Sequence, residues 1–458
     1  MTDEPAAAPR GTAGRLADAL AVYARPRIIG IAALGYASGL PLVLTGSTLA
    51  LYLADRGLSL QAIGLFSLVG LPYTLKPLWA PVLDTVRLPV FARLLGRRRG
   101  WLALTQILLV AAIAAMGALD PASGPLPIAL AALVVAVLSA TQDVAVDAFR
   151  VEAFEVEAQP AAMAAFVAAY RVALVAGGAG TVFLVTRLEG GEAAGTGAWA
   201  VAYALTGITM LVGLLATLAM REPSPPSQAG AAAVRGSRSL RAILVDALVA
   251  PFRTFMGKRD WVVLLLFVAL FKLGDALAGA LLGPFALDLG FDKATIAAVS
   301  QGVGLASALA GGFVGGLIGP SVSLATGLWI AGIAQMVSNL SFTALALVGP
   351  VTEVLVAAVA IEAFTGGVGT VLFVAFLSGL CTDRAHTATQ YALLSALASL
   401  GRTLFSASAG FVAAAAGWPL FFALTAVAAL PGLLFLWWLD RNGTLPATGR
   451  DAPPADRV

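Results

Sequence analysis

The sequence predicts an all-α membrane protein with twelve transmembrane helices in two six-helix halves. Of its 458 residues, 59% are hydrophobic and only 12% are charged, with a mean hydropathy of +0.91, whereas a soluble domain carries roughly 25% charged residues. The hydrophobic residues gather in stretches of about 20, long enough for helices that cross a bilayer. A polar segment divides these stretches into two sets of six.

Each half contains six predicted helices. The first half covers residues 28–219, with helices over residues 28–53, 60–82, 101–119, 126–148, 163–186 and 198–219. The second half covers residues 261–439, with helices over residues 261–287, 294–318, 321–345, 350–379, 388–414 and 417–439. Only Gly319 and Pro320, two residue types that interrupt helices, separate the second and third helices of this half.

The remaining residues form tails and a linker. Residues 1–27 and 440–458 are predicted to be tails, and the first lacks the apolar stretch and cleavage site of a signal peptide. Residues 220–260 link the halves. Apolar residues recur there at helical spacing, which predicts an amphipathic helix that lies on the membrane surface or packs on the bundle: Leu240, Ile243, Leu244, Ala247, Leu248 and Phe255.

The positive charges predict the orientation. If the N-terminus is cytoplasmic, that side carries 21 of the 28 Lys and Arg residues, and the opposite loops carry only Arg56, Arg187 and Lys293. Loops rich in Lys and Arg stay in the cytoplasm. Both termini are therefore expected to be cytoplasmic.

Several functional classes are disfavoured by what the chain lacks. Cys381 and His386 are the only residues of their types, which argues against a disulfide framework, a Cys/His metal site and a Ser–His–Asp triad. No phosphate-binding loop or dinucleotide fingerprint is present. We therefore expect a monomeric non-enzyme without metal, cofactor or nucleic-acid partner.

Four lone charges within hydrophobic stretches predict a polar chamber. Six spans, a linker and six more spans suggest an internal duplication, in which each half consists of two inverted triplets of helices. In this plan spans 1, 4, 7 and 10 line a central cavity. Asp143, Lys272, Asp275 and Glu362 all fall on spans 4, 7 and 10, and an intramembrane charge costs at least about 2.5–3.5 kcal/mol, so it is usually functional.

The acidic residues are candidates for proton coupling. Asp143 and Asp147 lie one turn apart on one face of span 4, and two nearby carboxylates disfavour joint ionisation. Asp275 and Glu362 are the other candidates. Three of them have a structural alternative: Asp147 could pair with a cation such as Arg171, Asp275 could pair with Lys272, and Glu362 could be a protonated carboxyl bonded to a neighbouring helix.

The candidate substrate contacts are cations and polar groups within the spans. Guanidinium and ammonium groups bind carboxylates, and amides and hydroxyls suit neutral polar groups. The set is Tyr36, Thr45, Gln142, Arg171, Lys272 and Arg402. A further candidate is a conformational latch after span 2, formed by Asp84, Arg97 and Arg98. Alternatively, these charges determine the orientation of the helices in the membrane. Within span 2, Lys76 lies toward the end that is followed by Asp84, and this position favours a structural role for Lys76.

Several of these stretches resemble the AmpG muropeptide permeases of the major facilitator superfamily. The resemblance covers residues 28–439. Its motifs are Ser38–Pro41, Thr45–Thr48, Ile63–Phe66, Lys76–Asp84, Gly96–Trp101, Ser139–Asp147, Phe271–Ala276, Gly366–Thr370 and Thr389–Leu397. One departure is visible, because the turn at Gly319 and Pro320 lacks the acidic and basic residues found after span 2.

The resemblance implies a function. AmpG proteins lie in the inner membrane of Gram-negative bacteria and import GlcNAc–anhydro-MurNAc peptides, driven by the proton gradient, for peptidoglycan recycling. Two alternatives remain from the residues. One is a related carrier of another cargo such as acetyl-CoA, because Lys272, Arg171 and Arg402 would suit a phosphate-rich ligand. The other is a non-transporting membrane sensor or chaperone on a transporter fold.

Overall fold

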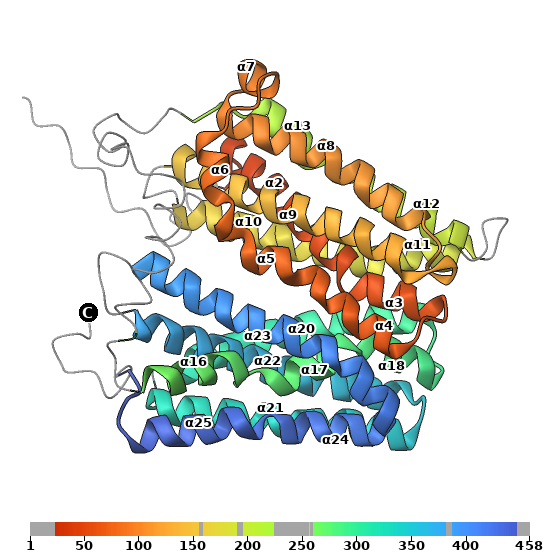
Figure 1. Ribbon diagram of the computed structural model, residues 1–458, viewed down its shortest axis with the longest axis vertical. Helices are drawn as coiled ribbons and strands as arrows, with labels where there is room; N and C mark the ends of the chain where they lie inside the picture. Colours follow the sequence, from red (N-terminus) through yellow and green to blue (C-terminus); the bar gives the residue numbers. More distant parts are fainter. Residues whose placement is uncertain are drawn as a thin grey trace, which may run out of the picture.

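The computed structural model describes residues 23–154, 159–189, 196–223, 256, 260–319, 321–381 and 387–446. All regular elements within these residues are helical, and eleven helices are long and apolar enough to cross a membrane. Figure 1 shows two bundles lying side by side, with the first half in red to yellow-green and the second half in green to blue. The predicted class, an all-helical multi-pass membrane protein, is confirmed.

Five of the six spans of the first half are long helical passages. Span 1 consists of α2 (Pro26–Thr45) and α3 (Ser47–Asp55), spans 3 and 4 are α8 (Arg97–Ala118) and α9 (Pro125–Ala153), and α7 (Phe91–Leu95) precedes α8. Span 5 consists of α10 (Gln159–Val175), the π turn η5 (Ala176–Gly180) and α11 (Thr181–Leu188). Span 6 consists of α12 (Thr196–Ile208) and α13 (Leu211–Ala219). These bounds lie within a few residues of the predicted ones.

The second half repeats this pattern. Span 7 consists of α16 (Trp261–Leu270), α17 (Leu273–Ala280) and α18 (Leu282–Leu289), and span 8 of α19 (Lys293–Ala297), the π turn η6 (Ala298–Val303) and α20 (Gly304–Ile318). Spans 9, 10 and 11 are α21 (Leu324–Val348), α22 (Thr352–Leu380) and α23 (Thr387–Ala416). Span 12 consists of α24 (Trp418–Ala428) and α25 (Leu430–Arg441). The amphipathic helix predicted over residues 240–255 lies outside the described residues.

Span 2 is not the continuous helix that the sequence predicted. It crosses the bundle as α4 (Leu60–Leu65), η1 (Phe66–Gly70), α5 (Leu71–Leu75), η2 (Lys76–Leu78) and α6 (Ala80–Thr85). Pro72, Pro77 and Pro81 account for the breaks, because proline lacks the backbone N–H that continues a helix. The interruption places the charged residue Lys76 in a short 3₁₀ turn within the membrane region.

Glycines allow the closest helix contacts within each half. A Cβ atom on Gly35 of α2 would lie 2.3 Å from the carbonyl oxygen of Phe166 in α10. In the second half, a Cβ atom on Gly311 of α20 would lie 2.0 Å from the carbonyl oxygen of Phe364 in α22. Small residues let membrane helices approach in this way.

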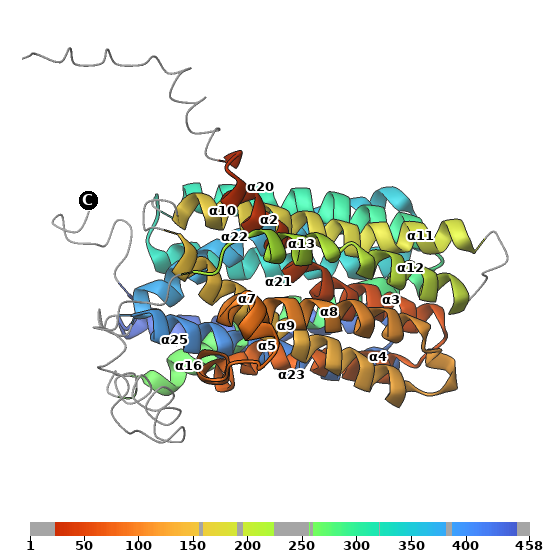
Figure 2. The same cartoon turned by 90° about the horizontal axis from the view of Figure 1, so that it is seen from above.

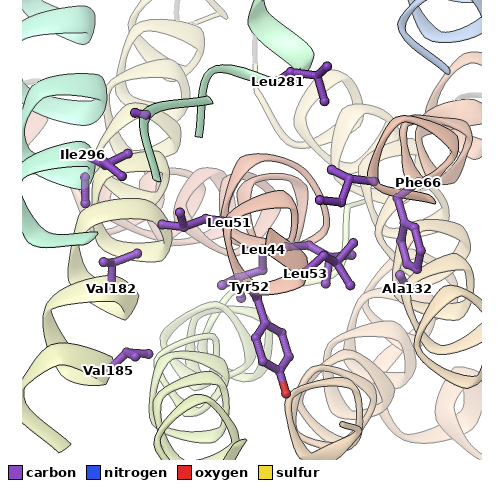
Figure 3. Close-up of a cluster of buried hydrophobic side chains, with 14 of the residues drawn as sticks. Leu44, Leu51, Tyr52, Leu53, Phe66, Ala132, Val182, Val185, Leu281 and Ile296 are labelled. Carbon is purple, nitrogen blue, oxygen red and sulfur yellow. The ribbon is translucent and has the colours of Figure 1, made fainter. Parts of the chain in front are cut away.

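The hydrophobic core shows how the two halves meet. We call the end where α2 begins and α25 ends the terminal end, and the end where α3 ends and α19 begins the distal end (Figures 1 and 2). One buried cluster at the distal end contains residues of both halves, among them Leu51, Tyr52, Leu281 and Ile296 (Figure 3). Toward the terminal end the core divides into two clusters, one from each half. The halves are therefore joined at the distal end and separate toward the terminal end.

Candidate substrate and proton site

Lys272 lies where span 7 breaks between α16 and α17. Its backbone departs from helical geometry, with φ −103° and ψ 20°. Its ammonium group donates hydrogen bonds to Thr370 Oγ1 at 2.8 Å and to the carbonyl oxygen of Gly366 at 3.2 Å. Both acceptors belong to α22. Lys272 therefore connects span 7 to span 10, two of the spans predicted to carry the site.

Two acids and a second cation surround Lys272. Its charge interacts electrostatically with Asp275, Glu362 and Arg402. The Oδ2 atom of Asp275 is buried and has no hydrogen-bond partner in the structure. The ammonium group of Lys272 gives its hydrogen bonds to α22, so the self-satisfied Lys272–Asp275 pair considered above is not formed. The result is a cluster with ionisable groups from spans 7, 10 and 11.

The first half carries a second charged cluster. Asp143 of α9 lies 3.7 Å from Lys76, measured between Oδ2 and Nζ. The neighbouring residue Trp79 donates a hydrogen bond to Thr141 Oγ1 on α9 at 3.2 Å. Span 2 is thus fastened to span 4, and Lys76 becomes the cation of an intramembrane pair.

Asp147 occupies a more open position than Asp143. Its side chain is 55% exposed, against 20% for Asp143, and it lies 3.7 Å from Arg150 on the same helix. Asp143 and Asp147 still interact electrostatically. The structure therefore separates the two acids, one paired with Lys76 and one near Arg150 rather than Arg171.

Tyr170 of α10 interacts with charges of both clusters. It interacts electrostatically with Asp143, Arg171 and Arg402, and thus with charges of both halves. The side chains of Arg171 and Arg402 are exposed. No sequence motif singled out Tyr170. The sequence feature that could have indicated Tyr170 is its position directly before Arg171, an arginine within a predicted span.

A cavity of about 330 Å³ lies between the halves. Spans 1, 2, 7 and 11 line it, rather than spans 1, 4, 7 and 10. The predicted residues Thr45, Asp275 and Arg402 are among its lining residues, and Tyr73 joins them. A neighbouring cavity of about 230 Å³ lies toward spans 5 and 8 and shares the lining residues Ser47, Ala50, Gly279 and Ala280.

Four predicted substrate contacts do not line these cavities: Lys272 and Arg171, described above, and Tyr36 and Gln142. The hydroxyl group of Tyr36 is 2.9 Å from Thr209 Oγ1, between α12 and α13. Gln142 is fully buried, and its Nε2 atom donates to Ser38 Oγ at 3.4 Å. Neither residue lines the two cavities between the halves. Tyr36 joins spans 1 and 6, and Gln142 joins spans 1 and 4.

At the distal end an ionic group joins the two halves. The ammonium group of Lys293, from the second half, lies 2.9 Å from Asp55 Oδ1 and 2.5 Å from Glu189 Oε1 of the first half. Trp199 donates to Asp55 Oδ2 at 2.7 Å. Asp292 caps α19 beside this group, and hydrogen bonds from Thr295 hold the pKa of Asp292 below its usual value. From the sequence, Lys293 was identified only as one of the few cations in the loops opposite the termini.

The predicted latch residues lie at the terminal end, within the first half. Arg97 and Arg98, at the start of α8, contact Glu152 at the end of α9, with nitrogen–oxygen distances of 3.2 and 2.6 Å. The backbone N–H groups of Arg98 and Arg99 donate to Glu222. Asp84 belongs to α6, but its side chain lies outside the described part of the structure.

Two similar proteins cover most of the chain. It is 37% identical over 418 residues to the anhydromuropeptide permease of Escherichia coli K12, which covers 91% of this chain and 80% of the permease. It is 34% identical to the putative transporter AmpG 4 of Rickettsia felis, over 91% of this chain and 97% of that protein. A family model described as acetyl-coenzyme A transporter 1 matches residues 28–120.

The fold is also found in solved transporter structures. A POT family transporter in complex with a thioalcohol-conjugated peptide superposes with a TM-score of 0.65 at 12% identity, over 90% of this chain and 96% of that chain. A bacterial homologue of the human lysosomal transporter Spinster superposes with a TM-score of 0.65 at 17% identity, over 93% of this chain and 98% of that chain. Together with the identity to the curated relatives over nearly the whole chain, this shows that the protein belongs to the AmpG family of membrane transporters.

Proposed function

We propose that this protein imports GlcNAc–anhydro-MurNAc peptides from the periplasm into the cytoplasm by proton-coupled alternating access. The observation that carries the proposal is the charged cluster of Lys272, Asp275, Glu362 and Arg402 beside the cavity between the halves. Intramembrane charges that face such a cavity mark substrate and proton pathways. Identity to an anhydromuropeptide permease supports the cargo.

The charges at the terminal end support the proposed orientation. Arg97, Arg98 and Arg99 begin α8 there, and loops rich in arginine remain cytoplasmic. The terminal end is then cytoplasmic and the distal end periplasmic. Because the halves share a core at the distal end and separate toward the terminal end, the structure corresponds to the state that faces the cytoplasm.

The cations are proposed to bind carboxylates of the stem peptide. Arg402 lines the cavity and Lys272 lies in the adjoining cluster, whereas Arg171 lies in the first half and interacts with Tyr170. Hydroxyl groups at the cavity, such as Thr45 and Thr403, suit the sugars. Contacts of Tyr36 or Gln142 with the sugars would require α2 to shift against its neighbours.

One of the acids is proposed to carry the proton. Asp275 and Glu362 share their surroundings with Lys272, and Asp143 and Asp147 lie in the first half. Protonation removes a buried charge, and a substrate shifts the two conformations only through its differential affinity for them. One charge that crosses 150 mV supplies roughly 3.5 kcal/mol, which supports on the order of 300-fold accumulation.

Transport into proteoliposomes tests the proposal. With an imposed pH gradient, radiolabelled muropeptide should accumulate in vesicles that contain the protein, and the accumulation should collapse when the gradient is dissipated. If uptake into these vesicles equals that into empty ones, the protein does not transport this cargo, and a sensor or chaperone becomes the better reading.

A second cargo is favoured by one observation. The matching family model describes an acetyl-coenzyme A transporter, and Arg402 at the cavity together with Lys272 in the adjoining cluster suits a phosphate-rich ligand. Competition decides between them in the same vesicles. Unlabelled muropeptide should block the labelled uptake, and acetyl-CoA should not. The reverse result would assign the acetyl-CoA cargo.

A further inference from the structure

A third cavity lies in the first half, outside the central site. Its volume is about 990 Å³, and it is bounded by the start of α2, the end of α9 and the end of α13. None of its lining residues lines either cavity between the halves. The cavity therefore has no part in the proposed transport site.

The cavity has a basic part and an apolar part. Among the described residues, Arg25, Arg27 and Arg221 are the only lining residues with polar side chains, and none of these lining residues is acidic. All three arginines are exposed, and the structure gives them no acidic partner among the described residues. Within the described part of the chain, the cavity thus presents three guanidinium groups that have no acidic partner.

The rest of the cavity wall is apolar. Ile29 is 56% exposed, Val212 is 47% exposed and Leu215 is 65% exposed, all on the membrane-spanning helices α2 and α13. The wall reaches Ala33 and Val212, seven residues inside the ends of their helices, which corresponds to roughly 10 Å at 1.5 Å per residue. A basic mouth at the membrane surface therefore leads into an apolar groove within the bilayer.

We propose that this cavity binds an anionic phospholipid of the leaflet at the terminal end. The guanidinium groups match the phosphate of the headgroup, and the groove matches an acyl chain. A sugar or peptide ligand fits poorly, because the apolar wall would leave its buried polar groups without hydrogen bonds. The bound lipid would hold α2, a helix of the transport site, against α13.

Lipid binding to the purified full-length protein tests this. Native mass spectrometry counts bound phosphatidylglycerol against phosphatidylcholine, for the parent and for the variant Arg27→Gln/Arg221→Gln. A matched control is Arg87→Gln/Arg93→Gln, which removes two exposed arginines of the same half that do not line this cavity. The parent and the control should prefer phosphatidylglycerol. The cavity variant should bind it roughly 30-fold more weakly, because each of the two lost arginines contributes a factor of roughly five to the affinity.

Each other outcome overturns the proposal. Equal losses in both variants would mean that general surface charge attracts the lipid. Equal binding of the two lipids by the parent would mean an unselective apolar groove. Binding of neither lipid would mean that the chain itself fills the cavity. A thermal-shift arm with inorganic phosphate separates the sources: if phosphate alone stabilises the parent as phosphatidylglycerol does, the ligand is a free anion.

Discussion

At the scale of single residues, Lys272 is the group best placed to discriminate between substrates. Substitution Lys272→Gln should raise the KM for a peptide-bearing muropeptide by on the order of tenfold, because a charge-assisted hydrogen bond to a carboxylate contributes about 1.5–3 kcal/mol. Uptake of the bare disaccharide should change little. Uptake kinetics with both ligands check this.

A structural role for Lys272 makes a different prediction. The ammonium group also holds α22 through Thr370 Oγ1. Substitution Thr370→Val removes this acceptor and leaves the cation in place. If Lys272→Gln and Thr370→Val impair both ligands equally, Lys272 serves helix packing and not recognition of the peptide.

Glu362 offers a test of proton coupling. Substitution Glu362→Gln preserves the shape of the side chain and removes its titration. Gradient-driven accumulation should fall from on the order of 300-fold to the equilibrium level, while exchange of substrate across the membrane continues. The control is Glu353→Gln, an exposed acid at the start of the same helix. Unimpaired accumulation in Glu362→Gln would assign the proton to another acid, with Asp143→Asn the next variant to measure.

The sequence predicted which residues are charged within the membrane but not which of them pair. A charge in an apolar stretch can be recognised without knowing how the helices pack. This identified Asp143, Lys272, Asp275 and Glu362. The contact between Lys76 and Asp143 joins positions far apart in sequence, and it depends on how span 2 is broken. Helical spacing relates residues of one helix only, so it favoured Asp84 as the neighbour of Lys76.

At the scale of elements, the two halves meet most tightly where α4 packs on α23. A Cβ atom on Gly410 of α23 would lie 1.8 Å from the carbonyl oxygen of Leu60 in α4. Substitution Gly410→Ala should therefore separate these helices and reduce stability by about 1–3 kcal/mol, the usual cost of overpacking. Thermal unfolding in detergent measures it.

A matched glycine gives the control for that experiment. Gly302, in the π turn of span 8, has open space where a Cβ atom would stand. Substitution Gly302→Ala should leave the unfolding temperature nearly unchanged. An equal loss in both variants would place the effect in helix geometry rather than in contact between the halves.

Span 2 marks the limit of prediction at this scale. Eleven spans were predicted within a few residues, because length and hydropathy alone determine them. Span 2 has suitable hydropathy too, but Pro72, Pro77 and Pro81 divide it into short helices. Hydropathy reports whether a segment crosses the membrane and does not report whether its backbone is continuous.

At the scale of the whole molecule, the sequence predicted two halves but not which end holds them together. That property depends on contacts across the interface, such as the shared distal core and the ionic group of Lys293. Lys293, Asp55 and Glu189 come from spans 8, 1 and 5. If transport requires the distal end to open, this group must break in every cycle.

Lys293 is therefore expected to set the balance between the two conformations. Its side chain is 13% exposed, and those of Asp55 and Glu189 are 18% and 29% exposed, so water screens the group only in part. Charge-assisted hydrogen bonds of this kind contribute about 1.5–3 kcal/mol. Substitution Lys293→Gln should consequently increase the population open at the distal end on the order of tenfold or more.

Thiol labelling measures that population. In a Cys381→Ser background, Ser47→Cys places a thiol on the wall shared by the two cavities between the halves. A membrane-impermeant reagent added on the distal side should label it faster in Lys293→Gln than in the parent, because the distal end opens more often. Lys293→Arg should restore slow labelling, and Arg187→Gln, which removes a distal cation that contacts Phe183, should leave the rate unchanged. Equal rates in Lys293→Gln and the parent would mean that the apolar contacts alone keep the distal end closed.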